Sequence, residues 1–269
     1  MKGLLSVSFG TSIAETREKT IDVVEERLAA EFADYAFYSA WTSGKIVAKV
    51  RAERGEHHDT LEEAFARISA DGIDDLTIAT MCLMRGFEMK RAEEAARAWL
   101  QEAPGRTVRL AAPLLYSEAD RKALAKVICD EFADVAPEEA LLLMGHGSSD
   151  AKPAAGEVDP NAVYAQIQEE MHALGRRFFF MGTVEGTPTF DDAVALVEES
   201  GVSRVCLAPF MIVAGDHARN DLAGDDGDSW KNMLAAHGYE TRAVLRGLGE
   251  YPAVHEIVCE HAREAAVLG

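Results

Sequence analysis

The sequence predicts an α/β protein built from two similar halves, each with a parallel sheet covered by helices. Short runs of apolar residues alternate with stretches that have the apolar spacing of amphipathic helices, which is the order expected of a doubly wound parallel sheet. The chain also repeats itself at a nearly constant spacing. Its 269 residues leave room for two domains of ordinary size.

Eight segments are candidates for strands. Most of their residues are apolar on both faces, as a strand covered by helices on two sides requires. They are residues 4–8, 35–40, 76–81, 108–112, 141–144, 178–183, 205–210 and 243–246.

Helices are expected between these strands. Thr-Leu-Glu-Glu at residues 60–63 is a capping box, in which the side chains of Thr60 and Glu63 satisfy each other's backbone amides. Pro160 and Pro188 are typical of the first turn of a helix, where a missing amide hydrogen costs nothing.

Three segments of the first half align, in the same order, with three segments of the second half. Residues 4–12 match 141–149, residues 37–44 match 179–186, and residues 72–88 match 201–217. A shared strand–turn–helix order explains this spacing but not the matched glycines, so we expect a duplication. The predicted domains are residues 1–135 and 136–269, because residues 133–139 include a proline and have no apolar periodicity.

Composition excludes some partners. The chain has 27 basic and 46 acidic residues, a net charge of −19, and therefore repels nucleic-acid phosphates and anionic lipid. Its four cysteines form no Cys-x-x-Cys pair, which favours reduced thiols in a cytoplasmic protein over a zinc knuckle or a disulfide framework. The apolar run at residues 4–7 is too short for a signal peptide or a membrane span.

The aligned segments suggest a metal site. Ligands bind at the carboxyl ends of strands in open α/β sheets, and all three segments end in such loops. At the three equivalent strand-end positions the first half has Phe9, Ser43 and Glu88, and the second half has His146, Glu185 and His217. Two imidazoles and one carboxylate suit Co²⁺, Ni²⁺, Fe²⁺ or Zn²⁺, and three protein ligands leave positions open for a substrate.

Each predicted ligand also has a structural explanation. His146 lies between two glycines, which argues against a packed core histidine. Glu185 could be an acid favoured at a helix entry, and His217 could be a neighbour of an N-cap. Their occurrence at equivalent positions favours the metal site. Outside these positions, His57 and His58 precede the capping box in a polar loop, where we expect them to be solvated.

Several motifs resemble those of the anaerobic sirohydrochlorin cobaltochelatases, which are class II chelatases. The motifs are Ser-Val-Ser-Phe-Gly-Thr-Ser at 6–12, Thr-Ser-Gly at 42–44, Met-Gly-His-Gly at 144–147, Val-Glu-Gly at 184–186, Ala-Gly-Asp-His-Ala at 214–218, Asn-Asp at 220–221 and Asp-Ser-Trp-Lys at 228–231. The resemblance spans nearly the whole chain.

This resemblance implies the class II chelatase fold, with two Rossmann-like halves and a tetrapyrrole cleft between them. It implies that His146, Glu185 and His217 ligate Co²⁺, the substrate metal. Because an imidazole becomes free to accept a proton once metal transfer begins, we assign the first proton to His146 and the second to Glu185. The resemblance also implies no nucleotide cofactor and association into homo-oligomers. The residues expected to contact the tetrapyrrole are Phe9, Gly10, Thr11, Ser12, Ser43, Arg85 and Glu88, with Arg85 and Arg219 as partners for its carboxylates.

The expected reaction is insertion of Co²⁺ into sirohydrochlorin, or a close precorrin, with release of two protons in anaerobic cobalamin synthesis. The alternatives are a chelatase for nickel or iron, a non-catalytic carrier of metal or tetrapyrrole, and a zinc hydrolase. One departure from the family bears on the metal and the tetrapyrrole. Cys82 stands where the family usually has a histidine after the third strand of the first half.

Overall fold

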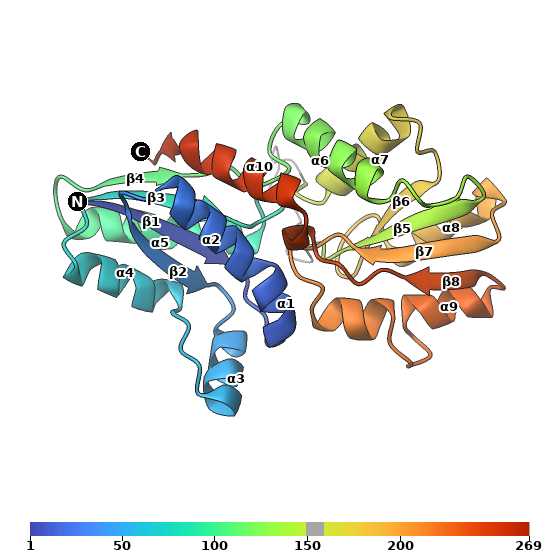
Figure 1. The fold of residues 1–269 in the computed structure, drawn as a ribbon, viewed down its shortest axis with the longest axis horizontal. Coiled ribbons are helices and arrows are strands. Elements are labelled where there is room, and N and C mark those ends of the chain that lie inside the picture. Colours follow the sequence, from blue (N-terminus) through green and yellow to red (C-terminus); the bar gives the residue numbers. More distant parts are fainter. Residues whose placement is uncertain (149–158, 269) are drawn as a thin grey trace. The chain divides into compact units, whose positions relative to one another are not determined.

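The computed structural model describes residues 1–148 and 159–268 and has the α/β fold that the sequence predicts (Figure 1). The chain forms two compact units. The first consists of Met1–Tyr116 and Pro252–Gly269, and the second of Ser117–Tyr251. Among the described residues, no helix combines the length and the apolar character needed to cross a membrane. Ser149, at the end of one aligned segment, lies outside the described residues.

The first unit contains a five-stranded sheet in the order β2-β1-β3-β4-β9. The first four strands of the list are parallel, and β9 runs antiparallel to β4. The strands are β1 (Lys2–Ser8), β2 (Ala36–Trp41), β3 (Asp75–Thr80), β4 (Thr107–Leu110) and β9 (Ala266–Val267), and the helices are α1 (Ala14–Lys19), α2 (Ile21–Glu31), α3 (Gly44–Arg54), α4 (Leu61–Ala70), α5 (Phe87–Glu102) and α10 (Pro252–Arg263).

The second unit contains a parallel four-stranded sheet in the order β6-β5-β7-β8. Its strands are β5 (Glu139–Gly145), β6 (Phe179–Thr183), β7 (Arg204–Pro209) and β8 (Glu240–Ala243), and its helices are α6 (Glu118–Glu131), α7 (Ala162–Ala173), α8 (Phe190–Ser200) and α9 (Trp230–Ala236), with a π-helical turn η1 (Ala218–Leu222) and a 3₁₀ turn η2 (Leu248–Glu250). The order of these four strands matches β2-β1-β3-β4, as the internal repeat predicts.

The units divide elsewhere than the sequence predicted. The expected boundary was at residues 135/136, but α6 packs on α7 and belongs to the second unit, whereas α10 packs on α2 and β3 of the first (Figure 1). Val254 and Val258 are buried, and Glu256 pairs with Arg27 of α2 at 2.8 Å. The boundary was missed because this return of the C-terminal helix depends on long-range packing, which leaves no local signal.

Several element bounds also differ from prediction. The eighth strand lies at 240–243 instead of 243–246, because this edge strand is largely exposed and lacks an apolar pattern. The two residues of β9 are too few to predict. Pro160 and Pro188 precede the N-caps Asn161 and Thr189 instead of lying in the first turn. The capping box of Thr60 and Glu63 is confirmed.

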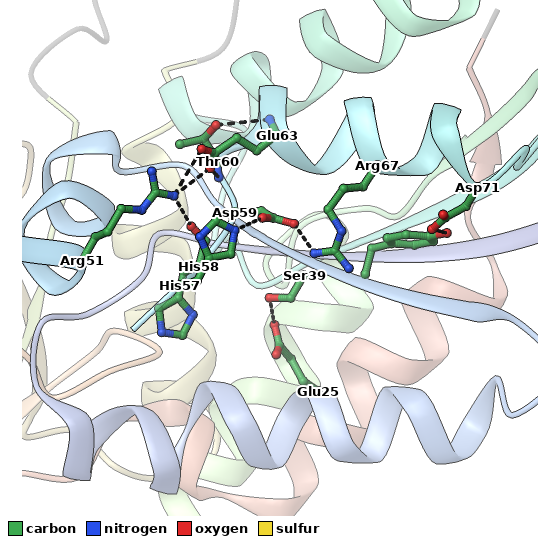
Figure 2. A network of polar contacts seen from close by, with 11 residues as sticks. Glu25, Ser39, Arg51, His57, His58, Asp59, Thr60, Glu63, Arg67 and Asp71 are labelled. Atoms are coloured by element: carbon green, nitrogen blue, oxygen red, sulfur yellow. Dashed lines mark hydrogen bonds and ion pairs between the residues drawn. The ribbon is translucent and has the colours of Figure 1, made fainter. Parts of the chain in front are cut away.

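A polar network fastens the loop before α4 to β2 (Figure 2). The Asp59 side chain is 2% exposed, pairs with His57 Nε2 at 2.8 Å and accepts a hydrogen bond from Arg67. The backbone amide of Trp41 donates to the Asp59 carbonyl at 2.8 Å. His58 stacks on the Trp41 ring at 3.7 Å between centroids, so the expectation that His58 is solvated is wrong.

A second feature of the first unit is a largely buried carboxyl group on α2. Burial raises the pKa of Glu25 to about 7, although a hydrogen bond from the Ser39 hydroxyl, at 2.6 Å, favours the charged form. The Glu25 carboxyl therefore keeps a proton in the folded protein at pH values where an exposed glutamate has lost it.

Replacement of this carboxyl should change how stability depends on pH. Between the ordinary value of 4.5 and the folded value of about 7, the folded state holds a proton that the unfolded state has released, so this group destabilises the fold as pH rises. We expect the unfolding free energy of Glu25→Gln, relative to wild type, to increase by about 3 kcal/mol between pH 4.5 and 8, measured by urea denaturation. A difference that stays constant over this range would contradict the assignment.

The network around Asp59 predicts unequal effects of two neighbouring substitutions. Asp59→Ala removes a buried acceptor from two partners and should cost about 1–3 kcal/mol of unfolding free energy. His57→Ala should cost under about 0.5 kcal/mol, because the imidazole is mostly exposed. Urea denaturation measures both, and equal losses would show that Asp59 has no special part in fixing the loop.

Candidate metal centre

The loop that carries His146 leaves β5 in a conformation that needs glycine. Gly147 has φ +77°, and a Cβ atom at this position would lie 2.6 Å from the backbone nitrogen of Gly186. A Cβ atom on Gly186 would in turn meet Asn161 Oδ1 at 2.4 Å. The glycines beside His146 and Glu185 therefore allow the loops after β5 and β6 to touch.

Backbone hydrogen bonds continue the β5–β6 pairing into these loops. The amide of Val184 donates to the Gly145 carbonyl at 3.0 Å, and the amide of Glu185 donates to the His146 carbonyl at 2.9 Å. His146 and Glu185 are therefore neighbours at the carboxyl ends of adjacent strands, as the sequence predicted.

His217 follows β7, the strand on the other side of β5, and directly precedes η1. Its ring lies 4.8 Å from the His146 ring between centroids, at an interplanar angle of 80°. Both rings are partly buried. The structure thus brings together two histidines that are 71 positions apart in the sequence.

Hydrogen bonds select the free nitrogen of each ring. His146 Nδ1 lies 3.0 Å from the Gly147 carbonyl oxygen, and His217 Nδ1 lies 2.5 Å from Asp221 Oδ2. Both oxygens are acceptors, so each Nδ1 carries the hydrogen and each Nε2 keeps its lone pair for a metal. Sequence reasoning missed Asp221, although its spacing of four residues from His217 in a helical turn is a signal of such a pair.

The three predicted ligands do not form a compact cluster in this structure. Glu185 is exposed, and the donor atoms of His146, Glu185 and His217 do not all lie within 4.8 Å of one another. In the described part of the chain, His57, Asp59 and Glu63 are the group that meets this criterion. A metal bound by the predicted trio therefore requires the donor atoms of these side chains to move closer together.

The His57 cluster is better explained as a structural network (Figure 2). Arg67 pairs with Asp59, and Arg51 Nη2 lies 3.0 Å from Glu63 Oε2. The same Glu63 oxygen accepts from the backbone amide of Thr60 at 2.9 Å, which completes the capping box. A cation would have to displace both guanidinium groups from carboxylates that they already neutralise.

Two residues that sequence reasoning missed, Tyr164 and Asn161, hold the His146 loop in place through hydrogen bonds. The Tyr164 hydroxyl accepts from the Gly147 amide at 3.2 Å, and burial raises the pKa of Tyr164 to about 12. The Asn161 side chain accepts from the Ser148 amide at 2.9 Å and donates to the Ser148 carbonyl at 3.0 Å. Tyr and Asn at these positions of a helix carry no local signal of this role.

The equivalent edge of the first unit holds the predicted substrate residues. Phe9 is 47% exposed, which excludes a core role. Gly10 has φ +90°, and a Cβ atom there would lie 2.6 Å from the Trp41 ring, while Thr11 and Ser12 are buried in the same loop. Ser43 is the N-cap of α3.

The remaining predicted residues differ in how exposed they are and in whether other side chains already bind them. Glu88 lies in the first turn of α5, and its Oε2 atom is buried with no hydrogen-bond partner in the described part of the chain. Burial and the charge of Glu88 raise the pKa of Cys82 to about 12, so the thiol stays protonated. Arg85 pairs with Glu93 at 2.6 Å, and Arg219 is exposed on η1.

Comparisons with known proteins identify relatives over nearly the whole chain. The sirohydrochlorin cobaltochelatase of Salmonella typhimurium is 36% identical over 265 residues, 98% of this chain and 96% of the relative. The sirohydrochlorin cobaltochelatase CbiKC of Nitratidesulfovibrio vulgaris is 26% identical over 98% of this chain and 90% of its own length.

Solved structures show the same fold. SirB from Bacillus subtilis with Fe³⁺ superposes with a TM-score of 0.66 at 15% identity, covering 98% of this chain and 95% of that chain. The sirohydrochlorin chelatase SirB from Bacillus subtilis subspecies spizizenii, in complex with cobalt, gives 0.63 at 13% identity with the same coverage. The sequence profile described as "Cobalt chelatase (CbiK)" matches residues 2–267. This chain therefore belongs to the cobalt chelatase (CbiK) family.

Proposed function

We propose that this protein inserts Co²⁺ into sirohydrochlorin, using His146, Glu185 and His217 as metal ligands. The observation that carries the proposal is the pair of adjacent imidazoles in an edge-to-face arrangement, each with Nδ1 engaged by an oxygen and Nε2 left for a metal. Membership of the cobalt chelatase family and the similarity to two sirohydrochlorin cobaltochelatases support the choice of reaction.

The reaction exchanges one dication for two protons. Co²⁺ enters the macrocycle, and the two pyrrole N–H groups each lose a proton, so charge is balanced. Neutral imidazoles bind such an ion reversibly, and Glu185 supplies the negative charge that offsets part of the metal's charge. As the metal leaves for the ring, His146 Nε2 becomes free and can accept the first proton. Glu185, which is exposed, passes the second proton to solvent.

Asp221 has a positioning role in this scheme. Its carboxylate holds the Nδ1–H of His217, which fixes both the tautomer and the direction of the ring. The Gly147 carbonyl does the same for His146 through a neutral acceptor. The His217 ring is thus oriented by a charged carboxylate, and the His146 ring by a neutral backbone carbonyl.

The choice of cobalt rests on the family and not on ligand preference. A site of two imidazoles and one carboxylate binds Ni²⁺ and Cu²⁺ more tightly than Co²⁺ under the Irving–Williams order. The geometry at the transfer step, or the supply of metal, must therefore select cobalt.

Loss of either imidazole should abolish metal insertion. We expect His146→Ala and His217→Ala to lower the rate of Co²⁺ insertion into sirohydrochlorin at least about 100-fold, followed by the absorption change of the macrocycle. His237→Ala is the matched control, since this exposed histidine of the same unit also pairs with a carboxylate, Glu198. If either ligand variant turned over as fast as the control, the assignment would be wrong.

Loss of the charged partner of His217 should weaken metal binding without removing a ligand. We expect Asp221→Asn to lower Co²⁺ affinity about 10–100-fold, measured by titration of the visible cobalt spectrum. Asp216→Asn, at an exposed carboxylate beside His217, serves as the control and should bind as wild type does. Equal affinities for the two variants would exclude the positioning role.

A further inference from the structure

One helix of the first unit departs from the acidic character of the chain. The net charge of the whole protein is −19. Helix α3 instead carries four basic residues and a single acidic one within eleven residues. The basic residues are Lys45, Lys49, Arg51 and Arg54, and Arg51 is already paired with Glu63.

Lys45 and Lys49 are exposed, and no carboxylate in the described part of the chain pairs with them. They lie four residues apart, so both ammonium groups project from the same face of α3. Within the described ranges, neither has a carboxylate oxygen within 4.0 Å, and the one polar contact is Lys49 Nζ to Ser12 Oγ at 3.4 Å. Four other lysines each have a carboxylate oxygen within 3.2 Å: Lys19, Lys122, Lys126 and Lys231. Among the described residues, Lys2 and Lys90 also have no carboxylate partner within 4.0 Å, so the position of Lys45 and Lys49 on one face of α3 is what sets this pair apart.

Packing fixes these two lysines at the carboxyl edge of the sheet. Val47 and Val50 bury the opposite face of α3 against Trp41, the last residue of β2. The contact from Lys49 to Ser12 places its ammonium beside the loop that follows β1. The exposed ring of Phe9 belongs to the same loop. The N-terminus of α3 adds the positive end of its dipole.

A third cation lies at the end of β2. Arg91 Nη1 donates to the Thr42 carbonyl at 2.5 Å, and its nearest recorded carboxylate is Glu62 at 3.8 Å. The hydroxyls of Ser8 and Thr42 at this edge are buried, with no hydrogen-bond partner in the described residues. Glu88 limits the acceptable position of an anion, because its own charge repels one on the β3 side.

We propose that Lys45 and Lys49, assisted by Arg91, anchor peripheral carboxylates of the tetrapyrrole while its ring lies against Phe9. This inference rests on the proposed function, since it deepens the recognition of that substrate. The ligand class is a flat polycarboxylate, because paired ammonium groups beside an exposed aromatic ring suit charge at the rim and an apolar face. Arg85, expected from sequence to serve as an anchor, is instead engaged by Glu93.

The test separates anchoring from metal chemistry. Binding of metal-free sirohydrochlorin is followed by quenching of its fluorescence, with Lys45→Gln/Lys49→Gln compared to wild type. We expect the dissociation constant to rise about tenfold or more at low salt and the difference to shrink as salt increases. The affinity for Co²⁺ in the absence of tetrapyrrole should be unchanged. Lys45→Arg/Lys49→Arg should restore most of the binding.

The matched control is Lys122→Gln/Lys126→Gln, which removes two lysines at the same spacing from α6, where each is paired. It should bind sirohydrochlorin as wild type does. Equal binding by the two Gln variants, or a loss that does not depend on salt, would overturn the anchor. Failure of wild type to insert Co²⁺ despite tight tetrapyrrole binding would instead refute the proposed function and leave the anchor standing.

Discussion

The candidate metal centre depends on the contact between the loops after β5 and β6. Parallel pairing of these strands continues past their ends, through the bond from the Glu185 amide to the His146 carbonyl. The loops after β5 and β6 lie so close that a Cβ atom at Gly147 or Gly186 would clash, which is why glycine follows both His146 and Glu185. The positions of His146 and Glu185 therefore depend on the backbone contact between these two loops.

The two units show what duplication of a scaffold does and does not preserve. Four strands keep the same order in both, and a glycine with positive φ follows the first strand of each unit, Gly10 and Gly147. The side chains at the strand-end positions have diverged. Phe9 has an aromatic ring where His146 has an imidazole, and Ser43 caps a helix where Glu185 has an exposed carboxylate. Cys82, where the family usually has a histidine, keeps its proton, because desolvation and the charge of Glu88 raise its pKa to about 12.

Features could be predicted from the sequence when the residues that determine them lie close together in the chain. Buried strands and the Thr60 capping box depend on neighbours in the chain, so periodicity and spacing revealed them. The self-alignment brought His146 and Glu185 to adjacent strands, as the structure has them. The return of α10 to the first unit, the exposed edge strand β8 and the Tyr164 support of the Gly147 amide depend on residues far apart in sequence.

The charge of the chain sets two opposing requirements on the proposed substrates. A net charge of −19 attracts a dication toward the protein but repels a macrocycle that carries many carboxylates. At physiological salt, exposed charges are screened beyond about 8 Å, so the overall charge affects approach more than final binding. Binding of the macrocycle's carboxylates then depends on the few cationic side chains at the carboxyl edge of the first unit's sheet. A lysine without a carboxylate partner lacks the stabilisation that an ion pair would provide. Its ammonium group stays hydrated until an anion binds. In a chain where acids outnumber bases, leaving Lys45 and Lys49 without such partners is the arrangement that allows an anionic substrate to bind against the net charge.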